Sequence, residues 1–299
     1  MKVALLQFAP EVGKVGENIR RADEILQKTR IPTDLGWLIL PEMAFSGYNF
    51  HSLEEIKPYL EPTTAGVSTQ WAIQVAKHYS CHVTVGYPEI TTTEPKTQYN
   101  STVTISPTGT ILVNYRKSFL YYTDETWASE PTSTFYTGIL GDLGPVTHGI
   151  CMDINPHRFL APWAAYEFAT AALNSPHISP GTLPPLICVS MAWLCHLSPE
   201  ELVQEPNNPD VATIAYWVER FQPLVEKSKE VEGVTYVVLA NRSGVEKGVC
   251  YAGSSTVMKI EAGGVSLFQT AGKSEEKCLV VDLNERPLLM VKTGGGAEL

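Results

Sequence analysis

Short apolar runs alternate along this chain with longer amphipathic stretches, and this alternation limits the folds open to it. Residues 3–8 and 37–40 are the first two such runs, and residues 18–29 between them carry apolar side chains at helical spacing. An apolar run of about four to eight residues without polar alternation is typical of a strand that is buried on both faces. The sequence therefore predicts an α/β fold built on a buried sheet.

The same patterns extend the prediction to the end of the chain. We expect helices at residues 68–79, 161–173 and 211–229, and strands at residues 83–87, 145–152, 186–191 and 235–240. Turn residues predict a hairpin of 100–106 with 111–115, and antiparallel strands at 251–258, 264–270 and 277–283. Residues 121–135 are interpreted as a loop, and residues from about 286 to 299 as a C-terminal tail. The sequence has no repeat and no linker-like change of composition, so we expect residues 1–299 to form a single domain.

Composition excludes several classes of partner. The chain carries a net charge of −10 and its 22 Lys and Arg residues are scattered, which argues against binding nucleic acid. It has no apolar run of roughly 18 residues and no secretory signal, so we expect a cytoplasmic protein that does not enter a membrane. Its six cysteines lack the spacing of a zinc site, so we expect reduced thiols, no metal and no cofactor.

Three polar residues each stand at the end of a predicted strand. Glu42 follows residues 37–40, Lys117 follows the hairpin, and Cys151 ends the run at 145–152. Because strand ends in a buried sheet can converge on one crevice, we expect these three side chains to meet.

The chemistry of these side chains suits a covalent hydrolase. A thiol attacks as its thiolate, and Glu42 can take the proton of Cys151. The Lys117 ammonium can stabilise the thiolate and then the oxyanion of a tetrahedral intermediate, beside the backbone N–H of Met152. His148 stands three residues before Cys151 and so faces the other side of the strand, which argues against a Cys–His dyad. The alternatives are a buried structural cysteine, a turn-capping glutamate and an exposed lysine.

With these residues in this order, the chain resembles the nitrilase superfamily of carbon–nitrogen hydrolases. The matching stretches are Leu40-Pro41-Glu42, Tyr115-Arg116-Lys117, Gly149-x-Cys151-x-Asp153, Ala240-Asn241-Arg242-Ser243-Gly244 and Gly253-Ser254-Ser255. The resemblance implies a four-layer α-β-β-α sandwich that forms one carbon–nitrogen hydrolase domain. It also implies that Glu42 is the general base, Lys117 the oxyanion and thiolate stabiliser, and Cys151 the nucleophile.

Many amidases of this superfamily have a second glutamate shortly after the lysine. Glu125, in Asp124-Glu125-Thr126-Trp127, has the matching Glu-x-Trp spacing. The resemblance therefore implies that Glu125 is a positioning or second acid–base residue, with Glu130 as the competing candidate.

Departures from the commoner members indicate which amide is cut. Residues 152–159, 121–130 and 190–194 resemble the branch of fungal protein N-terminal amidases. Such enzymes hydrolyse the side-chain amide of N-terminal Asn or Gln to Asp or Glu with release of ammonia, in the N-degron pathway. The resemblance thus implies peptides and proteins with N-terminal Asn or Gln as partners.

That substrate brings a free α-ammonium group, which requires a carboxylate or neutral oxygens in the pocket. Asp124, Asp153 and Asn155 are the candidates near the motifs, although the resemblance favours a structural role for Asp153. Trp127 and Trp193 can form pocket walls or simply pack in the core. The segment at about 175–210 is longer than usual for the superfamily and can shape the pocket opening.

Two other functions stay open from the sequence. One is a small-molecule amidase or nitrilase with the same three residues, and the other is a non-catalytic binding protein on this fold. Intact Glu42, Lys117 and Cys151 argue against the second. Both a monomer and a homodimer are compatible with the sequence.

Overall fold

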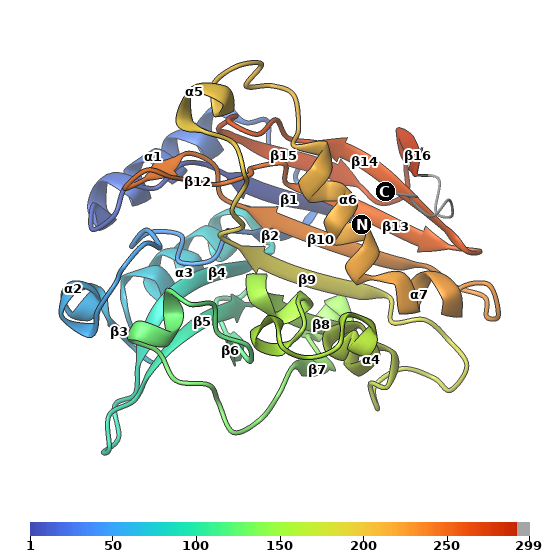
Figure 1. Cartoon of the computed structure of the whole chain (residues 1–299), viewed down its shortest axis with the longest axis horizontal. Helices are drawn as coiled ribbons and strands as arrows, with labels where there is room; N and C mark the ends of the chain where they lie inside the picture. The colour runs from blue at the N-terminus through green and yellow to red at the C-terminus, as the bar shows by residue number, and fades with distance from the viewer. Residues whose placement is uncertain (292–299) are drawn as a thin grey trace.

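Two stacked sheets form the centre of the molecule in the computed structural model, which describes residues 1–291 (Figure 1). The strands of the first sheet are β1 (Lys2–Gln7), β2 (Leu35–Ile39), β3 (Glu61–Pro62), β4 (His82–Ile90), β5 (Gln98–Ile105), β6 (Ile111–Arg116) and β15 (Lys277–Asp282). Those of the second are β7 (Tyr136–Ile139), β8 (Pro145–Ile150), β9 (Leu186–Met191), β10 (Thr235–Asn241), β13 (Thr256–Glu261), β14 (Gly264–Thr270) and β16 (Leu289–Val291). The strand order of the first sheet is β15-β1-β2-β4-β5-β6, with β3 beside β4. The strand order of the second sheet is β16-β14-β13-β10-β9-β8-β7.

Helices cover the outer face of each sheet (Figure 1). The first sheet carries α1 (Val15–Lys28) and α3 (Val67–Tyr79), and the second carries α4 (Glu167–Leu173), α6 (Val211–Arg220) and α7 (Gln222–Lys227). Shorter elements are α2 (Leu53–Ile56), α5 (Pro199–Leu202) and the small hairpin of β11 (Val245–Glu246) with β12 (Val249–Cys250). Turns of 3-10 helix lie at Lys57–Tyr59, Asp124–Thr126, Gly141–Leu143, Cys151–Ile154, His157–Phe159 and Trp163–Ala165.

Alternate residues of the central strands enter different apolar cores. In β1, Ala4 and Leu6 pack beneath α1 and α3, whereas Val3 and Leu5 pack between the two sheets. In β9 the same alternation divides the residues between the inter-sheet core and the core beneath α4, α6 and α7. Such a strand is apolar on both faces, which explains the continuous apolar runs of the sequence. The predicted four-layer α-β-β-α sandwich is therefore confirmed.

Strand direction brings the predicted site residues to one end of the sandwich. β2 and β4 pair in parallel, and β6 has the same direction because β5 pairs antiparallel with both β4 and β6. In the second sheet, β8, β9 and β10 are parallel. Residues that follow β2, β6, β8 and β9 therefore lie at corresponding strand ends.

Several predicted boundaries were wrong. The strand expected at 145–152 ends at Ile150, and Cys151 begins a 3-10 turn. The helix expected at 161–173 begins only at Glu167, and the strand expected at 251–258 begins only at Thr256. The helix expected at 211–229 is divided at Phe221, since a proline in the first turn starts a new helix there.

The segment at 175–210 is not one continuous insertion. It contains β9, which is hydrogen-bonded between β8 and β10 and separates residues 175–185 from residues 192–210. Part of the expected C-terminal tail forms β16, which pairs with β14. The rest of that tail, residues 292–299, lies outside the described residues.

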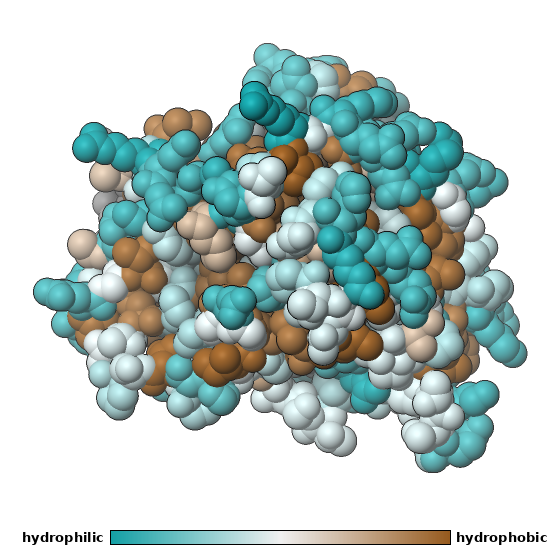
Figure 2. Space-filling model, turned by 180° about the vertical axis from the view of Figure 1, so that it is seen from behind, coloured by the Kyte–Doolittle hydropathy of each residue, from teal (hydrophilic) through white to brown (hydrophobic). Residues whose placement is uncertain are grey.

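From behind, the surface mixes hydrophilic residues, dense along its upper and right-hand margins, with hydrophobic residues exposed between them (Figure 2). Among the helices of residues 1–291, none combines the length and the apolarity that crossing a membrane requires.

Candidate active site

Glu42 stands in a tight turn that begins two residues after β2 ends. Its side chain is fully buried, and the next residue, Met43, has a φ of 52°. The backbone N–H of Ala192 donates to Glu42 Oε2 at 2.7 Å, which ties this turn to the segment that leaves β9 in the other sheet.

Gly86 allows this turn to lie against β4. A Cβ atom at this position would lie 2.6 Å from the Pro41 carbonyl oxygen and 2.7 Å from the Glu42 Cα. Because real Cβ atoms do not approach backbone so closely, any larger residue would push the Glu42 turn away.

Lys117 joins two carboxylates in a buried cluster. Its Nζ donates to Glu42 Oε1 and to Asp124 Oδ2, each at 2.6 Å, and all three side chains are inaccessible to solvent. Asn100 Nδ2 donates to the same two carboxylates, at 2.7 Å to Glu42 and 3.0 Å to Asp124. Each buried charge thus has an opposite charge and a hydrogen bond.

Cys151 is the first residue after β8 and has a left-handed backbone. Its φ of 42° is unfavourable for a residue with a Cβ, and strain of this kind is concentrated at functional sites. The Ala192 N–H, which donates to Glu42, also stabilises the ionised form of the Cys151 sulfur. The thiol therefore shares a backbone donor with the carboxylate that is its candidate base.

Asp153 fixes the cysteine turn against the lysine loop. Its Oδ1 accepts from the backbone N–H groups of Ser118 at 3.0 Å and Phe119 at 2.8 Å. Its Oδ2 accepts from the Tyr115 hydroxyl and the Ile150 N–H, each at 2.7 Å. Burial raises the pKa of Asp153 to about 6. These four contacts support the structural role.

Burial sets the protonation of the cluster. It raises the pKa of Glu42, and the opposite charge of Lys117 offsets this only in part. It raises the pKa of Cys151 well above the ordinary thiol value, and the charge of Glu42 adds to the effect. Burial alone would lower the pKa of Lys117, but Asp124 and Glu42 outweigh it and the net shift is upward. The resting site therefore holds a neutral thiol, a charged lysine and a strengthened carboxylate base.

Cys151 lines a cavity of about 690 Å³ whose wall is mostly apolar or aromatic. Three other predicted site residues line it as well, namely Met152, Asn155 and Trp193. Asp210, at the start of α6, contributes a carboxylate to the wall. A thiol and a carboxylate on the wall of one partly open cavity can hold a cationic substrate for covalent attack.

Two predicted residues do not reach the reacting groups. Glu125 is exposed on the surface and its nearest charged partner is Arg158, at 3.9 Å. The preceding residue, Asp124, instead contacts Lys117 directly, at 2.6 Å. Trp127 is buried in an apolar cluster with Met43 and does not line the cavity.

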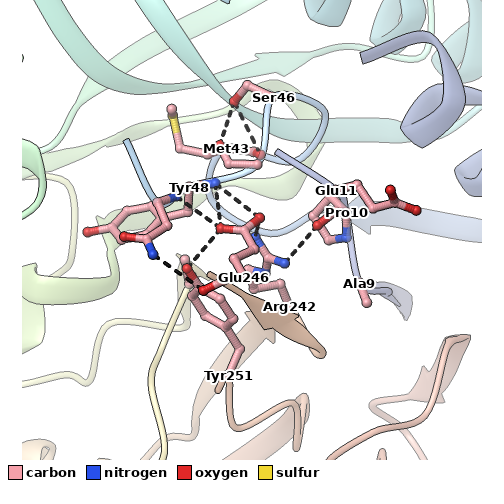
Figure 3. A network of polar contacts seen from close by, with 12 residues as sticks. Ala9, Pro10, Glu11, Met43, Ser46, Tyr48, Arg242, Glu246 and Tyr251 are labelled. Atoms are coloured by element: carbon pink, nitrogen blue, oxygen red, sulfur yellow. Dashed lines mark hydrogen bonds and ion pairs between the residues drawn. The ribbon is translucent and has the colours of Figure 1, made fainter. Parts of the chain in front are cut away.

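Tyr48 was missed by the sequence analysis and forms part of the cavity wall beside the cluster. Its ring centre lies 5.6 Å from Lys117 Nζ. The buried Glu246 carboxylate accepts from the Tyr48 N–H at 3.1 Å and from the Tyr251 hydroxyl at 3.0 Å, and it pairs with Arg242 (Figure 3). A buried ion pair thus fixes the backbone that presents Tyr48.

Asp210 and Ala192 were missed as well, because Asp210 belongs to no motif and Ala192 was considered only as part of the stretch 190–194. Asp210 is followed three residues later by Thr213, which is the pattern of a helix N-cap and says nothing of a cavity. Ala192 acts through its backbone N–H, which no side-chain pattern reveals. Within residues 1–291, no three His, Cys, Asp or Glu side chains are grouped to hold a metal ion.

Comparison with known proteins gives consistent matches. Residues 2–162 match the carbon–nitrogen hydrolase family. The chain is 34% identical over 293 residues to a protein N-terminal amidase of Schizosaccharomyces pombe, which covers 95% of this chain and 100% of the relative. It is 24% identical to a nitrilase of Pyrococcus abyssi, over 95% of this chain and 90% of the relative.

Solved structures share the fold. The crystal structure of an N-terminal amidase with an Asn-Glu-Ala peptide has a TM-score of 0.82 at 22% identity, over 98% of this chain and 99% of that one. An amidase from Nesterenkonia has a TM-score of 0.62 at 17% identity. The sequence matches, the two-sheet sandwich and the buried cluster all indicate the same family. The chain belongs to the carbon–nitrogen hydrolase family.

Proposed function

We propose that this enzyme is a protein N-terminal amidase, which hydrolyses the side-chain amide of N-terminal Asn or Gln to Asp or Glu and ammonia. The observation that carries the proposal is the cavity that combines the Cys151 thiol with the Asp210 carboxylate. The protein N-terminal amidases among its relatives, one of them matched over its full length, support the same activity.

In the first half of the proposed reaction, Glu42 removes the thiol proton and the Cys151 sulfur attacks the amide carbon. The oxyanion that forms is stabilised by the Lys117 ammonium and the backbone N–H of Met152. The tetrahedral intermediate collapses as Glu42 returns the proton to the amide nitrogen, and ammonia leaves. The product of this half is a thioester between Cys151 and the side-chain carbonyl of the substrate.

In the second half, a water molecule enters the position that ammonia has left. Glu42 takes a proton from this water as its oxygen attacks the thioester carbon. The carbon–sulfur bond then breaks, the Cys151 thiolate recovers a proton from Glu42, and the new side-chain carboxylic acid is released and loses its proton to solvent. Asp124 keeps the Lys117 ammonium charged and in place throughout, which both halves require.

Asp210 is best placed to bind the α-ammonium group of the substrate. Asp124 and Asp153, two of the residues proposed from the sequence, are fully buried in other contacts. The Asp210 carboxylate accepts only from Thr213 in the hydrogen bonds of the described residues, at 2.8 Å from its hydroxyl and 3.4 Å from its N–H. It lines the cavity with free acceptor capacity for an ammonium group.

Ammonia release from Asn- and Gln-initiated peptides and their N-acetylated forms tests this proposal. Acetylation removes the positive charge and should lower kcat/KM by about tenfold to a hundredfold, which is the worth of a charged hydrogen bond. Asp210→Asn should lower kcat/KM for the free peptides similarly, mainly through KM, while Asn still caps the helix. Asp142 is exposed, so Asp142→Asn is a matched control that should change neither kcat nor KM.

Equal turnover of acetylated and free peptides would contradict α-ammonium recognition. If the enzyme hydrolyses simple amides rapidly but none of the peptides, the small-molecule amidase is favoured instead. Hydrolysis of no amide, with Cys151 intact, would favour the non-catalytic binding protein.

We also infer a reducing, cytoplasmic location. The six cysteines are all free thiols, and five of them are buried. Unpaired thiols are usual in that compartment.

A further inference from the structure

Large apolar side chains are exposed around the cavity as well as inside it. Phe159 lines the cavity wall, yet 45% of its surface is exposed, and Leu160 beside it is 84% exposed. Tyr122 is 60% exposed, with its ring centre 6.0 Å from that of Phe159, and Trp163 is 45% exposed. We call these four residues the apolar rim.

The backbone that presents Phe159 is strained. Arg158 and Phe159 both have a φ of 55°, which residues with a Cβ seldom adopt, least of all in succession. His157 Nε2 lies 2.9 Å from Glu130 Oε1, and this contact ties the strained turn to the loop that carries Tyr122. The turn is therefore held in an unfavourable conformation that keeps an aromatic ring in solvent.

Trp163 is held on the other side of the same stretch. Its ring centre lies 5.4 Å from that of Tyr216, which lines the cavity. The Arg220 guanidinium lies 4.5 Å from the Trp163 ring centre and donates to the Trp163 carbonyl oxygen at 2.8 Å. The rim is thus continuous with the cavity wall at Phe159 and, through Tyr216, at Trp163.

The proposed function indicates which molecule covers this rim, namely the substrate polypeptide. A substrate whose first residue fills the cavity must carry its following residues out across the cavity edge. Those residues then lie on the rim, since Phe159 belongs to the wall and to the surface at once. Exposed aromatic side chains gathered at a cavity edge are typical of a peptide-binding surface.

We propose that the apolar rim binds the second residue of the substrate polypeptide and favours a large apolar side chain there. This inference rests on the proposed function and adds a specificity to it. An apolar second side chain would cover Phe159 and Leu160 and release the water on both surfaces. Glycine at the second position would leave the two side chains in solvent.

Turnover of two peptide series, Asn-Leu and Asn-Gly with the same following residues, tests this inference. The ratio of their kcat/KM values should be about fivefold in favour of leucine, because partial burial of such a side chain is worth roughly 1 kcal/mol. Phe159→Asn keeps a residue that accepts a left-handed backbone and removes the apolar ring. This variant and Leu160→Asn should each lower the ratio toward one.

The ratio within one enzyme does not depend on how much of the protein is folded, so misfolding cannot imitate the result. Leu288→Asn, at an exposed leucine beside β16, is the matched control and should keep the ratio of the unmodified enzyme. A ratio near one in the unmodified enzyme, or a ratio unchanged in both rim variants, would overturn the inference and leave the proposed function standing. Rim variants that change the sedimentation of the protein but not the ratio would make the rim a contact between copies of this chain. If no peptide with N-terminal Asn or Gln releases ammonia, the proposed function fails and this inference with it.

Discussion

Asp124 and Glu125 are neighbours in the chain, yet their surroundings are opposite. Asp124 is buried between Lys117 and Asn100, whereas Glu125 points to solvent near Arg158. Both belong to a single 3-10 turn, in which consecutive side chains point in different directions. A shift of one position thus decides which carboxylate belongs to the catalytic cluster.

Asp124→Asn should change the pH profile as well as the rate. The charge of Asp124 raises the pKa of Glu42, so its removal should lower that pKa. Glu42 must be ionised to act as a base. As the pH drops through the pKa of Glu42, kcat/KM should therefore fall, which gives the acid limb of the pH profile. Burial places this pKa above 4.5. The acid limb should therefore move to lower pH, and the rate should fall about tenfold to a hundredfold because Lys117 loses a charged partner.

Glu125→Gln is the matched control for this experiment, since it neutralises the adjacent carboxylate on the surface. It should leave the acid limb and the rate unchanged. A large loss in Glu125→Gln with full activity in Asp124→Asn would restore the assignment made from the sequence.

At the scale of elements, the position of Glu42 depends on how closely its turn packs on β4. Gly86 is the point of closest approach, and it makes room for the backbone of residues 41–43. The Ala44 N–H donates to the Gly86 carbonyl oxygen at 3.0 Å, which holds the turn in contact with the strand. The proposed general base is thus placed by a glycine on a different strand from the one that carries it.

Gly86→Ala should displace this turn and reduce both stability and activity. Overpacking of this kind costs about 1–3 kcal/mol of unfolding free energy, and a displacement of the base on the order of 1 Å costs about a hundredfold in rate. Urea unfolding and ammonia release measure the two effects. Gly16→Ala in α1 is the control, because a Cβ there meets nothing within 4 Å, and it should stabilise the protein by about 0.5–1 kcal/mol.

At the scale of the whole molecule, the proposed catalytic residues join the two sheets. Glu42 and Lys117 follow strands of the first sheet, whereas Cys151 and the Ala192 N–H follow strands of the second. Neither sheet holds a complete site. We therefore infer that the sandwich acts as one hydrolase domain.

A second link between the halves of the chain is the buried pair of Arg242 and Glu246 (Figure 3). Arg242 Nη2 donates to the Pro10 carbonyl oxygen at 2.8 Å, and Glu246 accepts from the backbone of Tyr48 and Asn49. Arg242→Met or Glu246→Gln should each cost about 3–5 kcal/mol, because each leaves a buried charge unpaired. The double variant should cost clearly less than the sum in urea unfolding, and a strictly additive result would contradict the coupling.

Much of this architecture was predictable from sequence, for identifiable reasons. Buried strands such as β1 and β9 are apolar on both faces, so their runs stand out. Glu42, Lys117 and Cys151 were found because each follows a predicted strand, and the structure brings the first two together and places Cys151 beside the same Ala192 N–H. Helix boundaries near 161 and 221 were not predicted, since 3-10 turns and a proline restart break the periodicity.

The substrate-facing side of the site was predicted only in part. Asn155 and Trp193 were named and do line the cavity, whereas Asp210 and Tyr48 were not named. Their positions depend on how distant segments pass the strand ends, and local patterns carry no information on that. The offset between Asp124 and Glu125 was out of reach because the stretch that contains their 3-10 turn has no clear period in the sequence.

Mass spectrometry of the enzyme, quenched in acid during turnover of an Asn-initiated peptide, tests the central claim most directly. We predict a covalent adduct on Cys151 with the mass of the peptide less one ammonia, slower formation of the adduct with the N-acetylated peptide, and no adduct in Cys151→Ala. Ammonia release without any adduct on Cys151, or an adduct that survives in Cys151→Ala, would contradict the account.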